Sequence, residues 1–260
     1  QAHDLWPQDS WFLTYADKFS EKRQYVLAEE KYDQLIAGMI PENIETMRTW
    51  LREKEYDTIL RVFDPPREGV LEYARLETEK LANFEKAETL LDLLLEENMY
   101  DYDALLQLGD TYMRWAQEEP ERYEDARFSY ATIIQQYGEE PEVLFRMLRY
   151  FMRTDNQEEV LRLKNYFQAD NSIEVNPQVY AELGGYLIDE GLLDGINDIL
   201  FRALDVNEEV PEAHYNLARY YHNTLEPFEE EKALKNSLDL LTADKFQPLD
   251  RRHRAMLIDT

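Results

Sequence analysis

The feature of this 260-residue chain that most constrains its fold is a repeat of about 34 residues. The stretch from Glu68 and the stretch from Tyr102 both read as two amphipathic helices joined by a short polar link. In the second stretch, Leu105, Leu108 and Tyr112 follow the spacing of one helix face. Because a single hairpin of this kind cannot bury its apolar face alone, the period predicts an array of stacked hairpins.

The repeat continues toward the end of the chain, and prolines mark several unit starts. Pro177 and Pro211 are 34 residues apart, and Pro141 opens the unit before them. Proline suits the first turn of a helix, because the amide hydrogen that it lacks would have no helical partner there. We count seven helical hairpins, which start near residues 9, 40, 68, 102, 141, 177 and 211.

These units resemble the tetratricopeptide repeat (TPR) family. Its motif has leucine and a small residue at positions 7 and 8, an aromatic residue at position 11, and small residues on the second helix. The best matches are Leu108-Gly109 with Tyr112, Leu183-Gly184 with Leu187, and Leu217-Ala218 with Tyr221, together with Ala87, Ala126 and Ala203 on the second helices. The resemblance implies an all-α, right-handed superhelical solenoid of about seven TPR-like hairpins.

The resemblance covers residues 9–242, and no Gly/Ser linker divides them, so we expect one continuous domain. After it, residues 248–258 read as a capping helix or as the first helix of a truncated repeat. A solenoid needs a polar outer face at its end. The arginines Arg251, Arg252 and Arg254 would supply one.

The charge of the chain limits its partners. Fifty-five acidic residues against 28 basic ones give a net charge of −27, which repels nucleic acid and anionic lipid. No segment approaches the ~18 apolar residues that a membrane helix needs. We therefore expect no nucleic acid and no membrane insertion, and we expect the paired glutamates to lie mainly at solvated helix ends.

The sequence lacks the motifs of common catalytic and metal sites. There is no cysteine, no phosphate-binding glycine loop and no HExxH pair. His214 and His222 lie eight residues apart, two helical turns rather than the single turn that zinc usually requires. We expect no catalytic residue, no cofactor, no metal and no enzymatic activity.

The resemblance also implies that the first helices of the hairpins line a concave binding surface. Carried over unit by unit, its inward positions predict a groove. The groove residues are Leu106, Met113, Arg114, Phe145, Arg146, Arg149, Met152, Arg153, Ala181, Gly185, Tyr215, Arg219 and His222.

Within this groove, Arg146, Arg149 and Arg153 fall on one helix face at i, i+3 and i+7. Guanidinium groups pair well with carboxylates, so the expected ligand is a protein or peptide with acidic and apolar residues. Ala181 and Gly185 are small and would leave space for it. The alternative is that the arginines serve salt bridges between helices, since glutamate is abundant.

The expected function is therefore a non-enzymatic scaffold or adaptor that binds partner peptides or helices within a larger assembly. The alternative is a self-associating structural subunit, for example of a bacterial envelope or motility machine, with Trp6, Trp11 and Phe12 among its contacts. The compartment stays open. A missing initiator methionine and the absence of cysteine fit a bacterial periplasmic protein, but equally a domain from a longer cytoplasmic one.

Overall fold

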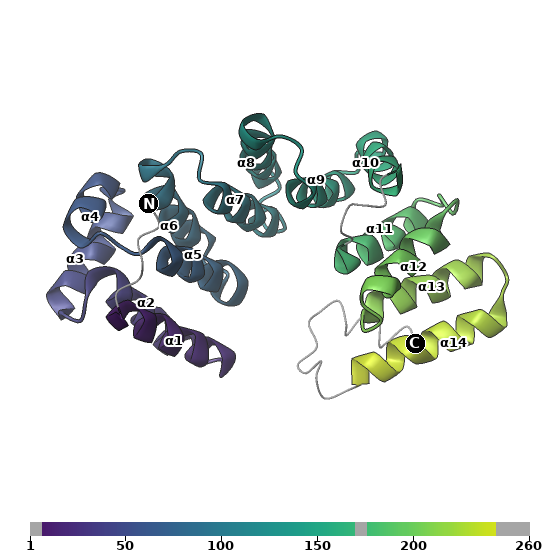
Figure 1. Ribbon diagram of the computed structural model, residues 1–260, viewed down its shortest axis with the longest axis horizontal. Helices are drawn as coiled ribbons and strands as arrows, with labels where there is room; N and C mark the ends of the chain where they lie inside the picture. The colour runs from purple at the N-terminus through teal and green to yellow at the C-terminus, as the bar shows by residue number, and fades with distance from the viewer. Residues whose placement is uncertain (1–6, 170–175, 243–260) are drawn as a thin grey trace. The chain divides into compact units, whose positions relative to one another are not determined.

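The computed structural model describes residues 7–169 and 176–242, and it is all-α over these ranges (Figure 1). Within them it has fourteen α-helices, one short π-helical turn and no strand. Taken in consecutive pairs the helices make seven hairpins, which confirms the expected all-α fold. Residues 248–258 and Trp6 lie outside the described residues. The helices are α1 (Pro7–Glu21), α2 (Tyr25–Ala37), α3 (Pro41–Arg52), α4 (Tyr56–Phe63), α5 (Arg67–Leu76), the π-turn η1 (Glu77–Leu81), α6 (Phe84–Glu97), α7 (Tyr102–Trp115), α8 (Arg122–Tyr137), α9 (Pro141–Arg153), α10 (Gln157–Ala169), α11 (Pro177–Asp189), α12 (Ile196–Val206), α13 (Pro211–Asn223) and α14 (Pro227–Thr242).

Local sequence signals explain where these helices begin. Pro41, Pro177 and Pro211 occupy the first turns of α3, α11 and α13. Before α7, the carboxylate of Asp101 accepts a hydrogen bond of 3.0 Å from the amide of Ala104. Such a cap satisfies one of the amides that a helix start leaves without a backbone partner, and it stabilises the helix by about 1 kcal/mol.

Two glycines at the small positions of the repeat allow the helices of a hairpin to approach closely. A Cβ atom on Gly109 of α7 would lie 2.3 Å from Cε1 of Tyr130 on α8. A Cβ atom on Gly184 of α11 would lie 2.5 Å from Cδ2 of Leu200 on α12. Both glycines are therefore required by packing, because any larger residue would overlap the facing side chain.

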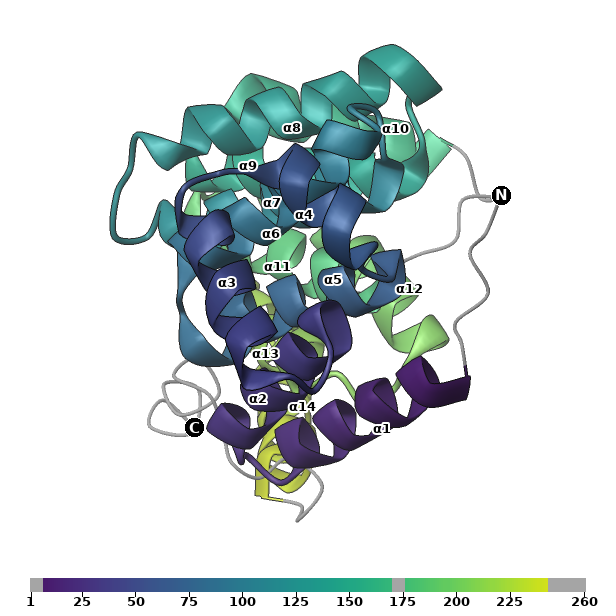
Figure 2. The ribbon, with the colours of Figure 1, turned by 90° about the vertical axis from the view of Figure 1, so that its left-hand side faces the viewer.

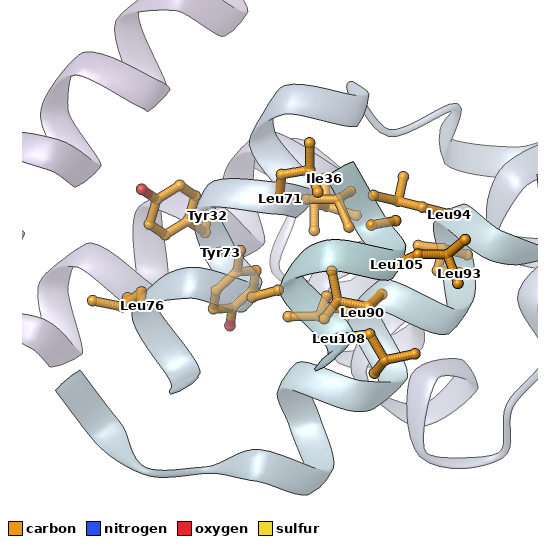
Figure 3. Close-up of a cluster of buried hydrophobic side chains, with 14 of the residues drawn as sticks. Tyr32, Ile36, Leu71, Tyr73, Leu76, Leu90, Leu93, Leu94, Leu105 and Leu108 are labelled. Carbon is orange, nitrogen blue, oxygen red and sulfur yellow. The ribbon is translucent and has the colours of Figure 1, made fainter. Parts of the chain in front are cut away.

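The chain divides into two compact units, residues 1–150 and residues 151–260. The continuous domain expected over 9–242 stays a prediction. In the first unit, the buried core runs through the helices from α1 to α9, with large side chains contributed mainly by α2, α5, α6 and α7. Figure 3 shows part of this core, in which Tyr32, Tyr73, Leu90 and Leu108 lie among other leucines. Each fully buried leucine stabilises the fold by about 1.5–3 kcal/mol relative to an exposed one.

The first unit also contains a direct contact between its first and third hairpins. Figure 2 shows α1 and α2 as an antiparallel pair beside α3, and α2 packs against both α3 and α5. The rings of Tyr32 on α2 and Tyr73 on α5 stack with centroids 5.1 Å apart. The α3–α4 hairpin reaches the same core through contacts of α3 with α2 and of α4 with α6. The first and third hairpins therefore touch each other as well as the hairpin between them.

In the second unit, α11 packs against α12 and α13, and α13 packs against α14. Phe167 of α10 lies against Tyr180 of α11, with ring centroids 6.3 Å apart. The guanidinium of Arg202 on α12 donates to the carbonyl of Phe167 over 3.0 Å and covers the ring of Tyr180. Buried aliphatic side chains such as Leu183 and Leu187 complete this packing.

None of the described helices combines the length and the apolar character that a bilayer-spanning helix requires.

Candidate functional site

The predicted groove residues of α7 differ in exposure. Leu106 is buried in the core of the first unit and is not presented to a ligand. Met113 is half-buried, packed against the same core. Arg114 is exposed, and among the described residues it has no acidic partner. Of the predicted groove residues on this helix, only Met113 and Arg114 are therefore accessible to a partner.

Helix α9 carries the arginine series that the sequence singled out. Phe145 is buried, whereas Arg149 and Met152 are half-buried and Arg153 is exposed. Arg153 has no acidic partner among the described residues. On this helix, the exposed guanidinium of Arg153 follows the half-buried Met152, whereas Arg149, one turn earlier, makes contacts within the folded chain.

Arg146, the first of that series, joins two helices of the first unit. Its Nε lies 3.4 Å from Oδ2 of Asp110 on α7, and its Nη1 lies 3.2 Å from Oε1 of Glu142. The other oxygen of Asp110 accepts a hydrogen bond of 2.8 Å from the hydroxyl of Tyr130 on α8. Burial, followed by the nearby charge of Asp110, raises the pKa of Tyr130 far above its ordinary value, so the hydroxyl stays protonated and donates. At Arg146 the structure thus shows the inter-helix salt bridge that the sequence left as the alternative.

The predicted gap on α11 is filled by a side chain from α13. Ala181 and Gly185 are both buried. The amide of Asn216 donates a hydrogen bond of 2.9 Å to the carbonyl of Ala181, and its nitrogen would lie 2.9 Å from a Cβ atom on Gly185. The expectation that these small residues leave space is therefore wrong, because Asn216 occupies that space.

The remaining candidates lie on α13 of the second unit. Tyr215 and Arg219 are half-buried, and the guanidinium of Arg219 lies 5.9 Å from the centre of the Tyr215 ring. Arg219 also donates to Oδ1 of Asn216 over 3.2 Å and forms an ion pair with Asp189 at the end of α11. His222 is exposed, and its Nδ1 lies 3.0 Å from Glu230 of α14. Arg219 is therefore held by its own unit in the same way as Arg146.

The candidate residues fall into two sets, one on α7 and α9 and the other on α11 and α13. Sequence reasoning missed Asn216 and Asp189, the residues that engage the groove positions of α11 and α13. Nothing in the local sequence indicates that Asn216 reaches the backbone of Ala181.

The described residues offer no group of three or more histidine, aspartate and glutamate side chains that could hold a metal ion. Among the described carboxyl groups, that of Glu77 on η1 has the largest change in pKa. Its side chain is buried away from the groove positions. Burial raises its pKa to about 6, against the opposing effect of the Lys86 ammonium 2.8 Å away. Glu77 and Glu29 both form ion pairs with Lys86, so this charge cluster is a contact between η1, α2 and α6.

Comparison with known proteins shows which solved structures have a similar fold. No protein-family model and no curated protein matches the sequence. Among solved structures, a tetratricopeptide repeat protein from Parabacteroides merdae is 17% identical with a TM-score of 0.57, and the match covers 96% of this chain and 97% of that one. A structure of MamA is 18% identical with a TM-score of 0.51, covering 63% of this chain and 92% of the other. A second structure of MamA has the same TM-score at 16% identity, covering 70% and 94%. At these identities, the similarity concerns the fold.

Proposed function

We propose, on the premise that this chain has a TPR-like helical-repeat fold, that it is a non-enzymatic protein-interaction scaffold. It binds partner peptides or helices through the first helices of its hairpins, and helix α9 provides the main contact. The preferred ligand carries acidic and apolar residues. This proposal is supported by the fold and by the chemistry of the side chains that α9 leaves accessible.

The observation that carries the proposal is the position of Arg149 and Arg153 in a chain of net charge −27. They share a face of α9, and Arg153 is exposed with no acidic partner among the described residues. The exposed guanidinium of Arg153 is available to a carboxylate of a partner, in the two-pronged geometry that arginine favours, and Arg149 adds positive charge on the same face.

Apolar contact would come from neighbouring half-buried side chains. Met152 lies next to Arg153 in sequence on α9, and Met113 lies one residue before the exposed Arg114 on α7. Methionine adapts its shape to varied partners, and it recurs at binding surfaces for that reason. On α13, Tyr215 is half-buried beside Arg219, and the pair offers the same combination of an apolar body and a cation.

The test is charge reversal on α9. The double variant Arg149→Glu/Arg153→Glu is compared with a control of equal charge change on other exposed cations, Arg61→Glu/Lys235→Glu. Fluorescence anisotropy with labelled synthetic peptides of alternating glutamate and leucine or phenylalanine gives the dissociation constants. We expect micromolar binding to the parent protein, at least a tenfold loss in the α9 variant, and no loss in the control.

Circular dichroism and melting curves establish that the variants are folded, since Arg149 makes contacts of its own in the folded chain. Equal binding by the α9 variant and the parent, or no binding of any acidic and apolar peptide, would reject the proposal. Stronger binding to lysine-rich peptides than to acidic ones would reject the stated ligand chemistry.

A further inference from the structure

The turn between α1 and α2 has an unusual surface for so acidic a chain. Lys18, Lys22 and Arg23 are exposed there, and none of them has an ion pair among the described residues. Val26 and Leu27, directly after the turn, are 74% and 40% exposed. We call these five residues the basic turn. The stretch from Lys18 to Leu27 has one acid, Glu21, so its net charge is positive.

The turn between α13 and α14 has the opposite charge and the same apolar character. Leu225 is 87% exposed and Phe228 is 76% exposed. Glu226 and Glu231 are exposed as well, and Glu229 is half-buried with a lysine, Lys232, 3.9 Å away. We call the five residues Leu225, Glu226, Phe228, Glu229 and Glu231 the acidic turn.

The backbone at Leu225 makes this leucine harder to explain by folding alone. Its φ is 62°, in the left-handed region, which residues other than glycine and asparagine rarely adopt. Left-handed residues in the equivalent turns of the other described hairpins are charged or small, namely Arg23, Lys54, Ala82, Asp155 and Gly191, and none of them is a large apolar residue. A leucine in this conformation that is also almost fully exposed gains nothing from burial within its own chain.

We propose that the basic turn of one molecule binds the acidic turn of a second copy of this chain, head to tail. Lysine and arginine of one turn pair with glutamates of the other, while Val26 and Leu27 meet Leu225 and Phe228. Large exposed apolar side chains rimmed by charge are typical of protein interfaces. Since the two surfaces differ, the contact is heterologous, and a pair of molecules keeps one free basic turn and one free acidic turn for further copies.

Charge complementarity favours a second copy over other occupants. An anionic membrane would attract the basic turn but would be repelled by the remainder of a chain with net charge −27. Two copies also repel each other at long range. At physiological salt, however, screening acts over about 8 Å, so pairs in direct contact persist while the distant repulsion is weakened. The contact is therefore expected near 0.15 M salt and not at very low salt.

The test is a charge swap followed by light scattering during size exclusion, over the micromolar to millimolar range at 0.15 M salt. Variant Lys22→Glu/Arg23→Glu has two acidic turns, and variant Glu229→Lys/Glu231→Lys has two basic ones. We expect the parent to associate increasingly with concentration and each variant alone to associate at least tenfold more weakly. An equimolar mixture of the two variants should regain association, because every turn then meets one of opposite charge.

Lys235→Glu, an exposed change elsewhere on α14, is the control and should behave as the parent. The apolar part of the contact is tested with Leu225→Gly, which relieves the backbone strain and removes the side chain. We expect weaker association together with unchanged or higher thermal stability.

A parent that stays monomeric at every concentration overturns the proposal. So does association that the single variants leave intact, or a mixture that fails to recover. Peptide binding by α9 should be unaffected in all these variants, so the two proposals succeed or fail separately.

Discussion

The hydroxyl of Tyr73 on α5 donates a hydrogen bond of 2.8 Å to the buried carboxylate of Asp33 on α2. This bond joins the first hairpin to the third, across a sequence separation of 40 residues. Asp33 is fully buried, and its other oxygen accepts from Arg48 of α3. One carboxylate therefore ties three hairpins together, and the predictions that follow begin with it.

The first prediction concerns the hydroxyl of Tyr73. In Tyr73→Phe the ring still stacks on Tyr32, but Asp33 loses a donor that it cannot replace with water. We expect the free energy of unfolding to fall by about 1–3 kcal/mol, the cost of leaving a buried acceptor without its partner. Urea denaturation measures it. Tyr166→Phe, which removes a hydroxyl from a more exposed ring on α10, should change stability by less than about 0.5 kcal/mol. Equal losses in the free energy of unfolding for the two changes would show that the hydrogen bond to Asp33 stabilises the fold no more than an exposed tyrosine hydroxyl does.

The second prediction concerns the attachment of the α3–α4 hairpin. The guanidinium of Arg48 donates from Nε to Oδ2 of Asp33 over 3.0 Å. Within the described part of the chain, the nearby Arg52 donates hydrogen bonds only to Thr49 and to the backbone carbonyl of Arg48, both on its own helix. Breaking a buried ion pair costs about 3–5 kcal/mol, but Arg48 is 41% exposed, so we expect about 1–3 kcal/mol for Arg48→Met.

Hydrogen exchange followed by mass spectrometry locates this effect. Amides of α3 and α4 should exchange faster in Arg48→Met than in the parent, and Arg52→Met should leave them unchanged. Faster exchange spread evenly over α1 to α8 would mean that Arg48 supports the whole unit instead of this hairpin.

The third prediction concerns the sign of a glycine substitution. Gly109→Ala would stabilise an ordinary exposed helix by about 1 kcal/mol, because alanine has the higher helix propensity. Here the new methyl group would overlap the ring of Tyr130, so we expect a loss of about 1–3 kcal/mol in the free energy of unfolding. A variant that melts above the parent in a calorimeter would contradict the close approach of α7 and α8.

The fourth prediction concerns pH and Glu77. Its pKa in the folded chain is about 6, raised from 4.5 mainly by burial, so the folded state binds this proton more tightly than the unfolded state does. The stability from this group is therefore complete below pH 4.5 and is lost as the pH rises through 6. The loss is about 2 kcal/mol by proton linkage.

Glu77→Gln cannot titrate, and Lys86 keeps Glu29 as its partner. The variant should therefore gain stability relative to the parent, by about 2 kcal/mol, between pH 4.5 and 7. The exposed Glu85→Gln serves as the control, and its difference from the parent should stay flat across this range. Denaturation curves at several pH values provide the comparison, and a flat difference for Glu77→Gln as well would disprove the raised pKa.

How far the candidate site could be predicted depends on the kind of contact involved. The positions of Arg149 and Arg153 on α9 follow from helical spacing, which is a local property. The pairing of Arg146 with Asp110 does not, because the two residues are 36 positions apart and meet only when α7 and α9 pack. The same reason explains why Ala181 and Gly185 were expected to leave a gap that Asn216 fills from another hairpin.

The sequence by itself determined the helices, their grouping into hairpins and the close packing at Gly109 and Gly184, because apolar periodicity, prolines and small residues act within one or two helical turns or recur at a constant interval. The tertiary structure alone decided that α2 contacts α5, that Asp33 and Glu77 are buried charges, and which arginines are taken up by acids of the chain itself. These outcomes depend on which distant helices pack together, and burial then sets the free energy of every charge at the contact. No local pattern of residues carries that information.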